Sequence, residues 1–236
     1  MVKSIIFWIF TCIITLIYAL FLLLSVLLFI KSKEKVTIFF RRLWGKTLVF
    51  MSGSKLEVKG LKNLNKEGTY IFMANHQSMF DIFALCTMPF YFLWFAKHNL
   101  FKIPIFGLAL KIVGSVPVNR TSLKKSYKSF KTAEEMIKKN KSLLFFPEGT
   151  RSTDSKMLPF KKGGFRIAID TGKSIVPMSI SGSGKIQRRG EFRIFPGKIK
   201  LIISPPISTD YYSLKKKDEL ANRVKEVIEE NLNTSI

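Results

Sequence analysis

The sequence predicts an α/β domain with a mixed, largely parallel sheet flanked by helices, preceded by an N-terminal membrane-embedded helical segment. Two observations carry this prediction. The stretch Ile5–Ile30 contains no charged residue, and beyond residue 52 short β-rich runs alternate with helical patterns. A length of 236 residues leaves room for one well-buried domain and the additional apolar sequence. We therefore expect a membrane anchor and interfacial helix over residues 1–51 and one α/β domain over residues 52–236.

The apolar stretch Ile5–Ile30 is long enough to cross a bilayer, because about 20 apolar residues span the hydrocarbon core as a helix. A cleaved signal peptide would have a shorter apolar core and a small-residue cleavage site after it. The sequence that follows is rich in lysine instead, so we expect an uncleaved anchor. One Lys precedes the stretch, and the positive-inside rule then places the remainder in the cytoplasm because of the basic residues that follow it: Lys31, Lys33, Lys35, Arg41 and Arg42.

The stretch Val36–Met51 alternates bulky apolar residues with basic ones. This pattern suits a helix lying in the membrane interface with its cations at anionic headgroups. The two apolar stretches also fit a helical hairpin embedded in one leaflet, and hydropathy does not separate these arrangements. The composition changes at Ser52-Gly53-Ser54, where we place the boundary of the anchor. The high Lys and Ile content and the compact length favour a bacterial inner membrane protein.

Beyond this boundary the elements follow in a regular order. Strands are expected over Lys55–Val58, Tyr70–Ala74, Tyr91–Phe95, Ser115–Val118, Leu143–Phe146, Ile175–Ile180 and Lys200–Ile203. Helices are expected over Met79–Thr87, Phe101–Ile112, Leu123–Lys139, Gly163–Thr171 and Ser213–Asn231, the last with Ser213 as its N-cap. The apolar run Met79–Ala96 resembles another membrane span, but Asp81 and Pro89 interrupt it, so we interpret it as a buried helix followed by a strand.

The formal net charge of +23 indicates a partner that carries negative charge. It arises from 39 Lys and Arg against 16 Asp and Glu. Nucleic acid, anionic lipid and phosphorylated substrates all fit such an excess. The membrane segment favours anionic lipid, and we expect no nucleic-acid partner. Cys12 and Cys86 show neither C-x-x-C spacing nor a disulfide framework, so we expect both thiols to be inert.

Polar residues follow two of the expected strands directly. One cluster is Asn75-His76-Gln77-Ser78-Met79-Phe80-Asp81, and the other is Pro147–Ser152. Ligand sites in α/β sheets collect beyond the carboxyl ends of the strands, so both clusters should open on one face. His76 has the pKa range of a general base, and Asp81 five residues later could orient its imidazole. Taken alone, the pair also fits a loop histidine and a helix cap.

The wider pattern resembles the glycerolipid acyltransferases, specifically the 1-acyl-glycerol-3-phosphate acyltransferase family. Four blocks in the order and spacing of that family carry the resemblance between Gly68 and Gly182. The first and third are Asn75-His76-x4-Asp81 and Phe146-Pro147-Glu148-Gly149-Thr150-Arg151-Ser152. The second contains Lys97, Ile103-Pro104, Gly107, Gly114 and Val118-Asn119-Arg120, and the fourth is Ile175-Val176-Pro177-Met178.

The resemblance implies transfer of a fatty acyl group from acyl-CoA or acyl carrier protein to the sn-2 hydroxyl of lysophosphatidic acid, forming phosphatidic acid. His76 would be the general base, oriented by Asp81, and the hydroxyl would attack the thioester without an acyl-enzyme. Backbone N–H groups in the turn after His76 or around Gly149 would stabilise the oxyanion. The resemblance assigns the binding of the acceptor to the following residues: Glu148, Gly149, Thr150, Arg151, Arg120 and Lys97.

No cofactor is expected beyond the acyl donor, and no His, Cys and carboxylate cluster has metal-ligand spacing. Lys161-Lys162-Gly163-Gly164 opens an expected helix, where it would contact phosphate or face solvent. We interpret His98 as a structural or surface residue.

Two alternatives stay open. The acceptor could be lyso-ornithine lipid, another lysophospholipid or glycerol 3-phosphate. A basic, membrane-tethered binding protein would use the Lys-rich stretch Leu123–Lys141 to bind nucleic acid or anionic lipid, but that reading explains only the charge.

Overall fold

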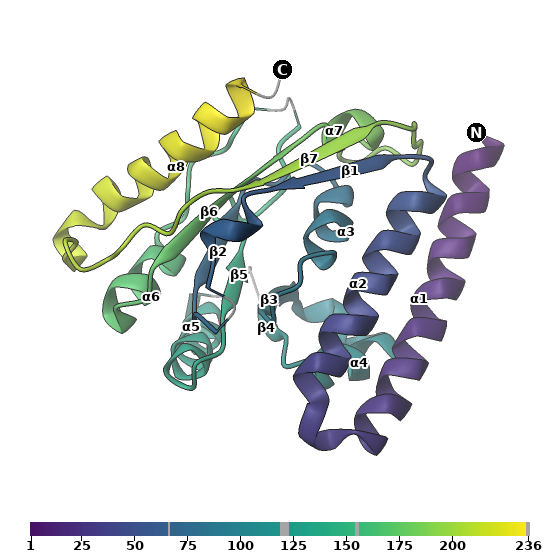
Figure 1. The fold of residues 1–236 in the computed structure, drawn as a ribbon, viewed down its shortest axis with the longest axis horizontal. Helices are drawn as coiled ribbons and strands as arrows, with labels where there is room; N and C mark the ends of the chain where they lie inside the picture. Colours follow the sequence, from purple (N-terminus) through teal and green to yellow (C-terminus); the bar gives the residue numbers. More distant parts are fainter. Residues whose placement is uncertain (66, 119–122, 154–155, 235–236) are drawn as a thin grey trace.

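A seven-stranded mixed sheet forms the centre of the molecule in the computed structural model, which describes residues 1–65, 67–118, 123–153 and 156–234 (Figure 1). Its strands are β1 (Lys55–Lys59), β2 (Ile71–Ala74), β3 (Leu93–Lys97), β4 (Val116–Val118), β5 (Leu143–Phe145), β6 (Ile175–Ser181) and β7 (Lys198–Ile203). They lie side by side in the order β1-β7-β6-β2-β5-β3-β4.

The sheet is largely parallel, and its direction changes once. From β6 through β2, β5, β3 and β4 every pair of neighbouring strands is parallel. Strand β7 runs antiparallel to β6, and β1 is parallel to β7. The two reversed strands therefore form one edge of the sheet, which confirms the mixed, largely parallel architecture. The carboxyl ends of β2, β5 and β3 consequently lie along the same side.

Helices cover both faces of the sheet because successive side chains of a strand point to opposite faces. Phe72 of β2 belongs to the apolar cluster beneath α3 (Phe80–Cys86) and the N-terminal helices. Its neighbours Ile71 and Met73 belong to the cluster beneath α5 (Leu123–Lys138), α6 (Gly163–Thr171) and α8 (Lys217–Asn233). All three side chains are fully buried. Burial of side chains of this size stabilises the fold by about 1.5–3 kcal/mol each.

The first two helices, α1 (Val2–Leu28) and α2 (Lys33–Met51), form an antiparallel hairpin beside the domain (Figure 1). Trp44 Nε1 of α2 donates a hydrogen bond to Thr15 Oγ1 of α1 at 3.0 Å. Gly45 lets α2 approach α3 closely, since a Cβ there would lie 2.6 Å from the carbonyl oxygen of Phe83. Among the described residues, α1 is the one helix long and apolar enough to cross a membrane, and only 22% of its most apolar window is buried.

Both ends of α1 contact the α/β domain. Near its amino end, Ser4 Oγ accepts a hydrogen bond from the Ile194 N–H at 3.1 Å, and Trp8 Nε1 donates to the Phe192 carbonyl at 2.8 Å. Near its carboxyl end, Val26 shares an apolar cluster with Ala109 of α4 (Phe106–Ile112). The helix therefore lies along the domain and does not project away from it.

Several expected elements differ from the observed ones. The helix expected over Phe101–Ile112 is interrupted: a 3-10 helix spans His98–Lys102, and α4 begins at Phe106. Pro104 disfavours helical backbone at the residue before it, and Ile105 has a φ of 61°. The third strand begins two residues later than expected, at Leu93, and reaches Lys97.

The C-terminal helix also begins differently, and one helix was not expected. The 3-10 helix Leu214–Lys216 precedes α8, and the side chain of Ser213 makes no capping hydrogen bond. Ser213 thus precedes the first helical turn as expected, but that turn is a 3-10 helix and the Ser213 side chain does not cap it. The short helix α7 (Ser183–Ile186) was not predicted from the sequence.

Candidate active site

His76 and Asp81 form a hydrogen-bonded pair directly after β2. Nδ1 of His76 lies 2.8 Å from Oδ2 of Asp81, and the Asp81 side chain is completely buried while that of His76 is 12% exposed. Because a carboxylate only accepts, the imidazole donates through Nδ1, and Nε2 is left for another partner. The spacing that the sequence identified therefore closes into the expected pair.

The same carboxylate oxygen organises the turn between the two residues. Oδ2 of Asp81 also accepts the backbone N–H groups of Gln77 at 2.7 Å and Ser78 at 2.8 Å. Asp81 lies in the first turn of α3, where a negative charge is favoured by the N-terminal end of the helix. One carboxylate oxygen therefore fixes both the turn and the imidazole, whereas Asp81 does not cap α3, whose N-cap is Met79 without a side-chain hydrogen bond.

The block Phe146–Ser152, which follows β5, contacts both the ring and the backbone of His76. The ring of Phe146 stacks on the imidazole with the ring centroids 3.8 Å apart and the planes at 13°. Glu148, only 3% exposed, accepts the His76 backbone N–H at 2.6 Å and the Leu158 N–H at 2.9 Å. Burial raises the pKa of Glu148, and these two hydrogen bonds oppose that shift. The first and third sequence blocks thus meet at the carboxyl ends of adjacent strands.

Gly149, Thr150 and Arg151 continue this block along the edge of the site. Gly149 has a φ of 73°, and a Cβ there would lie 2.8 Å from Cε of Lys161, whose side chain crosses it. Arg151 is partly buried, and Nη1 of Arg189 donates to its carbonyl oxygen at 2.6 Å. Burial and the neighbouring Arg189 lower the pKa of the Arg151 guanidinium. Cationic groups therefore gather beside His76.

Of the other two predicted binding residues, Lys97 and Arg120, the structure describes only Lys97. Lys97 is exposed at the carboxyl end of β3, on the same side of the sheet as His76. Arg120 lies outside the described residues. Lys162 forms an ion pair with Asp218 at 2.8 Å, while His98 is exposed at the start of a 3-10 helix.

The thiols and potential metal ligands of the described residues do not form a further site. No group of three or more His, Cys, Asp and Glu side chains within the described ranges is placed to hold a metal ion. Cys86 is buried, and its burial raises the pKa of its thiol to about 12, whereas Cys12 lies exposed on α1.

A polar pocket of about 700 Å³, which was not predicted from the sequence, adjoins the pair His76 and Asp81. Its walls include Gln77 and Ser152, which come from the two blocks around His76. The other wall is the segment 184–195 between β6 and β7, which we call the basic segment. It contributes four cations to the pocket: Lys185, Arg188, Arg189 and Arg193.

A buried glutamine links the basic segment to the turn after His76. Gln187 Oε1 accepts the Met79 N–H at 3.3 Å, and the Gln187 carbonyl accepts the Ser78 hydroxyl at 2.8 Å. Gln187 Nε2 donates to the carbonyl of Glu191 at 2.7 Å. The density of basic residues between positions 185 and 193 was the available sequence signal for this wall.

The region that contains the sheet and the two blocks of the site matches a known protein family. The acyltransferase family model matches residues 55–181, which include both blocks around His76. This chain belongs to the acyltransferase family.

Named relatives make the relationship more specific. The chain is 36% identical to a chloroplastic 1-acyl-sn-glycerol-3-phosphate acyltransferase of Brassica napus, over 88% of this chain and 59% of that protein. It is 32% identical to a 1-acyl-sn-glycerol-3-phosphate acyltransferase of Limnanthes alba, over 81% of this chain and 68% of that protein.

A solved structure resembles nearly the whole chain. The crystal structure of the 1-acyl-sn-glycerophosphate acyltransferase of Thermotoga maritima matches with a TM-score of 0.89 and 28% identity, covering 99% of this chain and 94% of that one. The chain spans about three-fifths of the length of the first curated relatives that it matches, 59% and 64%.

Proposed function

We propose that this chain transfers a fatty acyl group from a thioester donor to the sn-2 hydroxyl of 1-acyl-sn-glycerol 3-phosphate. The observation that carries the proposal is the pair His76 and Asp81, joined at 2.8 Å within the first block and contacted by Phe146 and Glu148 of the block after β5. The names of the relatives support lysophosphatidic acid as the acceptor. The products are phosphatidic acid and the free thiol of the donor.

In the proposed reaction His76 takes the proton of the acceptor hydroxyl at Nε2. The hydroxyl oxygen then forms a bond to the thioester carbonyl carbon, and the carbonyl electrons move to oxygen as an oxyanion. Collapse of this intermediate breaks the carbon–sulfur bond, and the imidazolium returns its proton to the leaving thiolate. Asp81 stabilises the imidazolium between these two steps and fixes Nδ1 as the donor. No acyl-enzyme is required.

The oxyanion donors are assigned to the block around Gly149. The turn after His76 does not offer them, because the N–H groups of Gln77 and Ser78 bind Asp81 and that of Met79 binds Gln187. The N–H of Gly149 is also used, since it donates to the Phe146 carbonyl at 2.9 Å. The N–H groups of the next two residues, Thr150 and Arg151, make no hydrogen bond within the part of the chain that the structure describes. These two groups are the candidates for the oxyanion hole.

The acceptor phosphate is assigned to Arg151, Lys97 and Arg120. Arg151 follows the oxyanion block, and its guanidinium suits a bidentate contact with phosphate. Glu148 serves this arrangement through positioning: its two carboxylate oxygens hold the backbone of His76 and of Leu158. A contact with the glycerol part of the acceptor, which the family resemblance implies for Glu148, would use the remaining lone pairs of the same carboxylate.

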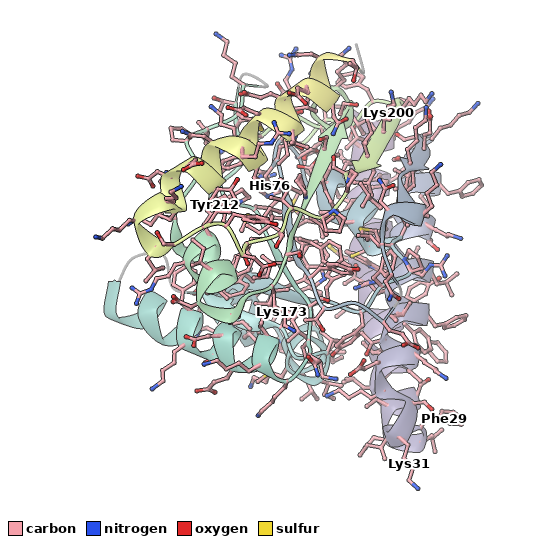
Figure 2. All side chains as sticks on the ribbon, turned by 60° about the vertical axis from the view of Figure 1, so that its left-hand side comes forward. Phe29, Lys31, His76, Lys173, Lys200 and Tyr212 are labelled. Carbon is pink, nitrogen blue, oxygen red and sulfur yellow. The ribbon has the colours of Figure 1, made fainter. Side chains whose placement is uncertain are left out.

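The N-terminal hairpin is the proposed membrane-embedded part, with its exposed apolar side chains in one leaflet. Helix α1 contacts the α/β domain at both ends, which supports insertion as a hairpin over a perpendicular span. Figure 2 shows Phe29 and Lys31 at the far tip of the hairpin, well away from His76. The proposed location is the inner membrane of a bacterium, with the α/β domain on its cytoplasmic face, where anionic lipid would meet the basic surface.

The test uses purified protein in detergent with labelled acyl-CoA and acyl carrier protein as donors. Lysophosphatidic acid is compared as acceptor with lyso-ornithine lipid, another lysophospholipid and glycerol 3-phosphate. Formation of phosphatidic acid that His76→Ala abolishes supports the proposal. Acylation of only another lysolipid would leave the role of His76 intact and refute the acceptor, whereas no transfer by folded protein would refute the enzymatic proposal.

A further inference from the structure

The basic segment lies on the opposite side of His76 from Lys97. The sheet order β6-β2-β5-β3 places β2, which leads to His76, between β6 and β3. The basic segment follows β6, whereas Lys97 ends β3. Cations therefore flank the general base on two sides. A transferase must hold two substrates around one base, and only one of these sides is needed for the acceptor phosphate.

The charges and the apolar surface of the lining residues indicate which class of ligand the pocket binds. Against its four cations, the lining contains one carboxylate, that of Glu191, which lies 4.0 Å from the Arg188 guanidinium. The walls offer one aromatic ring, Phe195, so a fatty acyl chain would find little apolar surface there. A volume of about 700 Å³ is in the range of small-molecule sites. The pocket thus suits a polar, anionic group and not an acyl chain.

The pocket wall is pre-organised by contacts on both sides of the cations. Gln187 holds the segment to the turn after His76, and Arg189 holds it to the Arg151 carbonyl. The Phe195 N–H donates to the Ile186 carbonyl at 2.9 Å, which closes the loop on itself. Arg188 keeps a side chain that is 75% exposed. The backbone of this wall is therefore fixed before a ligand arrives, and the Arg188 side chain stays accessible to it.

We infer that the pocket beside the basic segment binds the phosphate end of the phosphopantetheine arm of the acyl donor, an inference that rests on the proposed function. Acyl-CoA and acyl carrier protein share this arm, which is polar along its length and ends in phosphate. With the thioester at His76, the arm runs past Gln77 and Ser152, and its phosphate meets Arg188 and Arg193. The acceptor phosphate then occupies the side of Lys97.

The test replaces Arg188 and Arg193 together by Gln in the full chain. The matched control is Lys62→Gln with Lys173→Gln, which removes the same charge from the segments that precede β2 and β6 in the chain. Lys173 lies at the opposite end of the strands from His76 (Figure 2). Binding of coenzyme A is measured by equilibrium dialysis without acceptor. Initial rates are measured with acyl-CoA, acyl carrier protein and the phosphate-free donor acyl-pantetheine.

The expected result is at least a roughly tenfold rise in the Kd for coenzyme A and in the KM for both phosphorylated donors. The KM values for acyl-pantetheine and lysophosphatidic acid should stay within about twofold, and the control should resemble the wild type. Loss of coenzyme A binding would support the inference even if lysophosphatidic acid proved not to be the acceptor.

Three outcomes would overturn the inference. A raised KM for lysophosphatidic acid with unchanged donor constants would assign the pocket to the acceptor or to a lipid headgroup. An effect confined to acyl carrier protein would assign the segment to protein docking. Equal effects in the control variant would show that only net charge matters.

Discussion

Replacing Asp81 by Asn tests the proposed chemistry, because it keeps the size of the side chain and removes its charge. At the observed 2.8 Å, a full charge on each partner interacts by about 6 kcal/mol at an effective dielectric constant of 20. Since about 1.4 kcal/mol corresponds to a tenfold change in rate, this sets an upper limit of about four decades. The charge of the imidazolium is spread over its ring, so we expect kcat to fall by about 10²- to 10⁴-fold.

The substitution also affects stability, and this effect must be measured separately. Oδ1 of Asp81 is buried and has no hydrogen-bond partner among the described residues, so an amide NH₂ in its place would be an unsatisfied donor. Such a group costs about 1–3 kcal/mol of unfolding free energy.

Transfer from acyl-CoA to lysophosphatidic acid is measured at a temperature where thermal unfolding shows the variant fully folded, with His76→Ala as the inactive reference. A fall in kcat of less than about tenfold in folded Asp81→Asn protein would refute the assigned role of the carboxylate.

Three further results are expected. Burial raises the pKa of Glu148 in the folded protein, so ionisation of this carboxyl disfavours folding. Its contribution to the unfolding free energy should therefore decrease as the pH rises from about 4.5 through the raised pKa. Infrared titration of the wild type against Glu148→Gln measures the carboxyl midpoint, and a midpoint at or below 4.5 contradicts this prediction. Gly149→Ala should lower the unfolding free energy by about 1–2 kcal/mol because of its φ of 73°, as measured by denaturant unfolding; an unchanged midpoint contradicts the strain. Gly45→Ala should cost about 1–3 kcal/mol through overpacking against the Phe83 carbonyl, as measured by denaturant unfolding; an unchanged midpoint contradicts the close approach of α2 to α3.

The sequence predicted the elements whose signal is local. Strands such as β2 and β6 are short apolar stretches in the sequence. The polar residues directly after β2 and β5 predicted the edge of the sheet where His76 and Glu148 meet. The residue before Pro104 carried a signal for the break before α4, but the apolar pattern around it favoured a continuous helix. The positive φ of Ile105 depends on tertiary packing and has no comparable signal.

The parts of the site that the sequence did not predict depend on contacts between distant segments. Gln187 and the basic segment lie beside the turn after His76 because β6, the strand that leads to them, is the parallel neighbour of β2. Glu148 was expected at the acceptor, and its hydrogen bonds to the backbone of His76 and Leu158 follow from the adjacency of β2 and β5. Spacing along the chain contains no information about either contact.

The contact between α1 and the basic segment imposes an order on events during synthesis. Trp8 emerges from the ribosome first, and its hydrogen-bond partner Phe192 follows 184 residues later. At 5–20 residues per second this delay is roughly 10 to 40 s. The apolar helix is therefore synthesised well before the residues that it contacts, and at the proposed membrane location lipid would cover its apolar side chains during that interval. At that proposed location, the last step of folding would pack the second half of the domain against a helix already inserted in lipid.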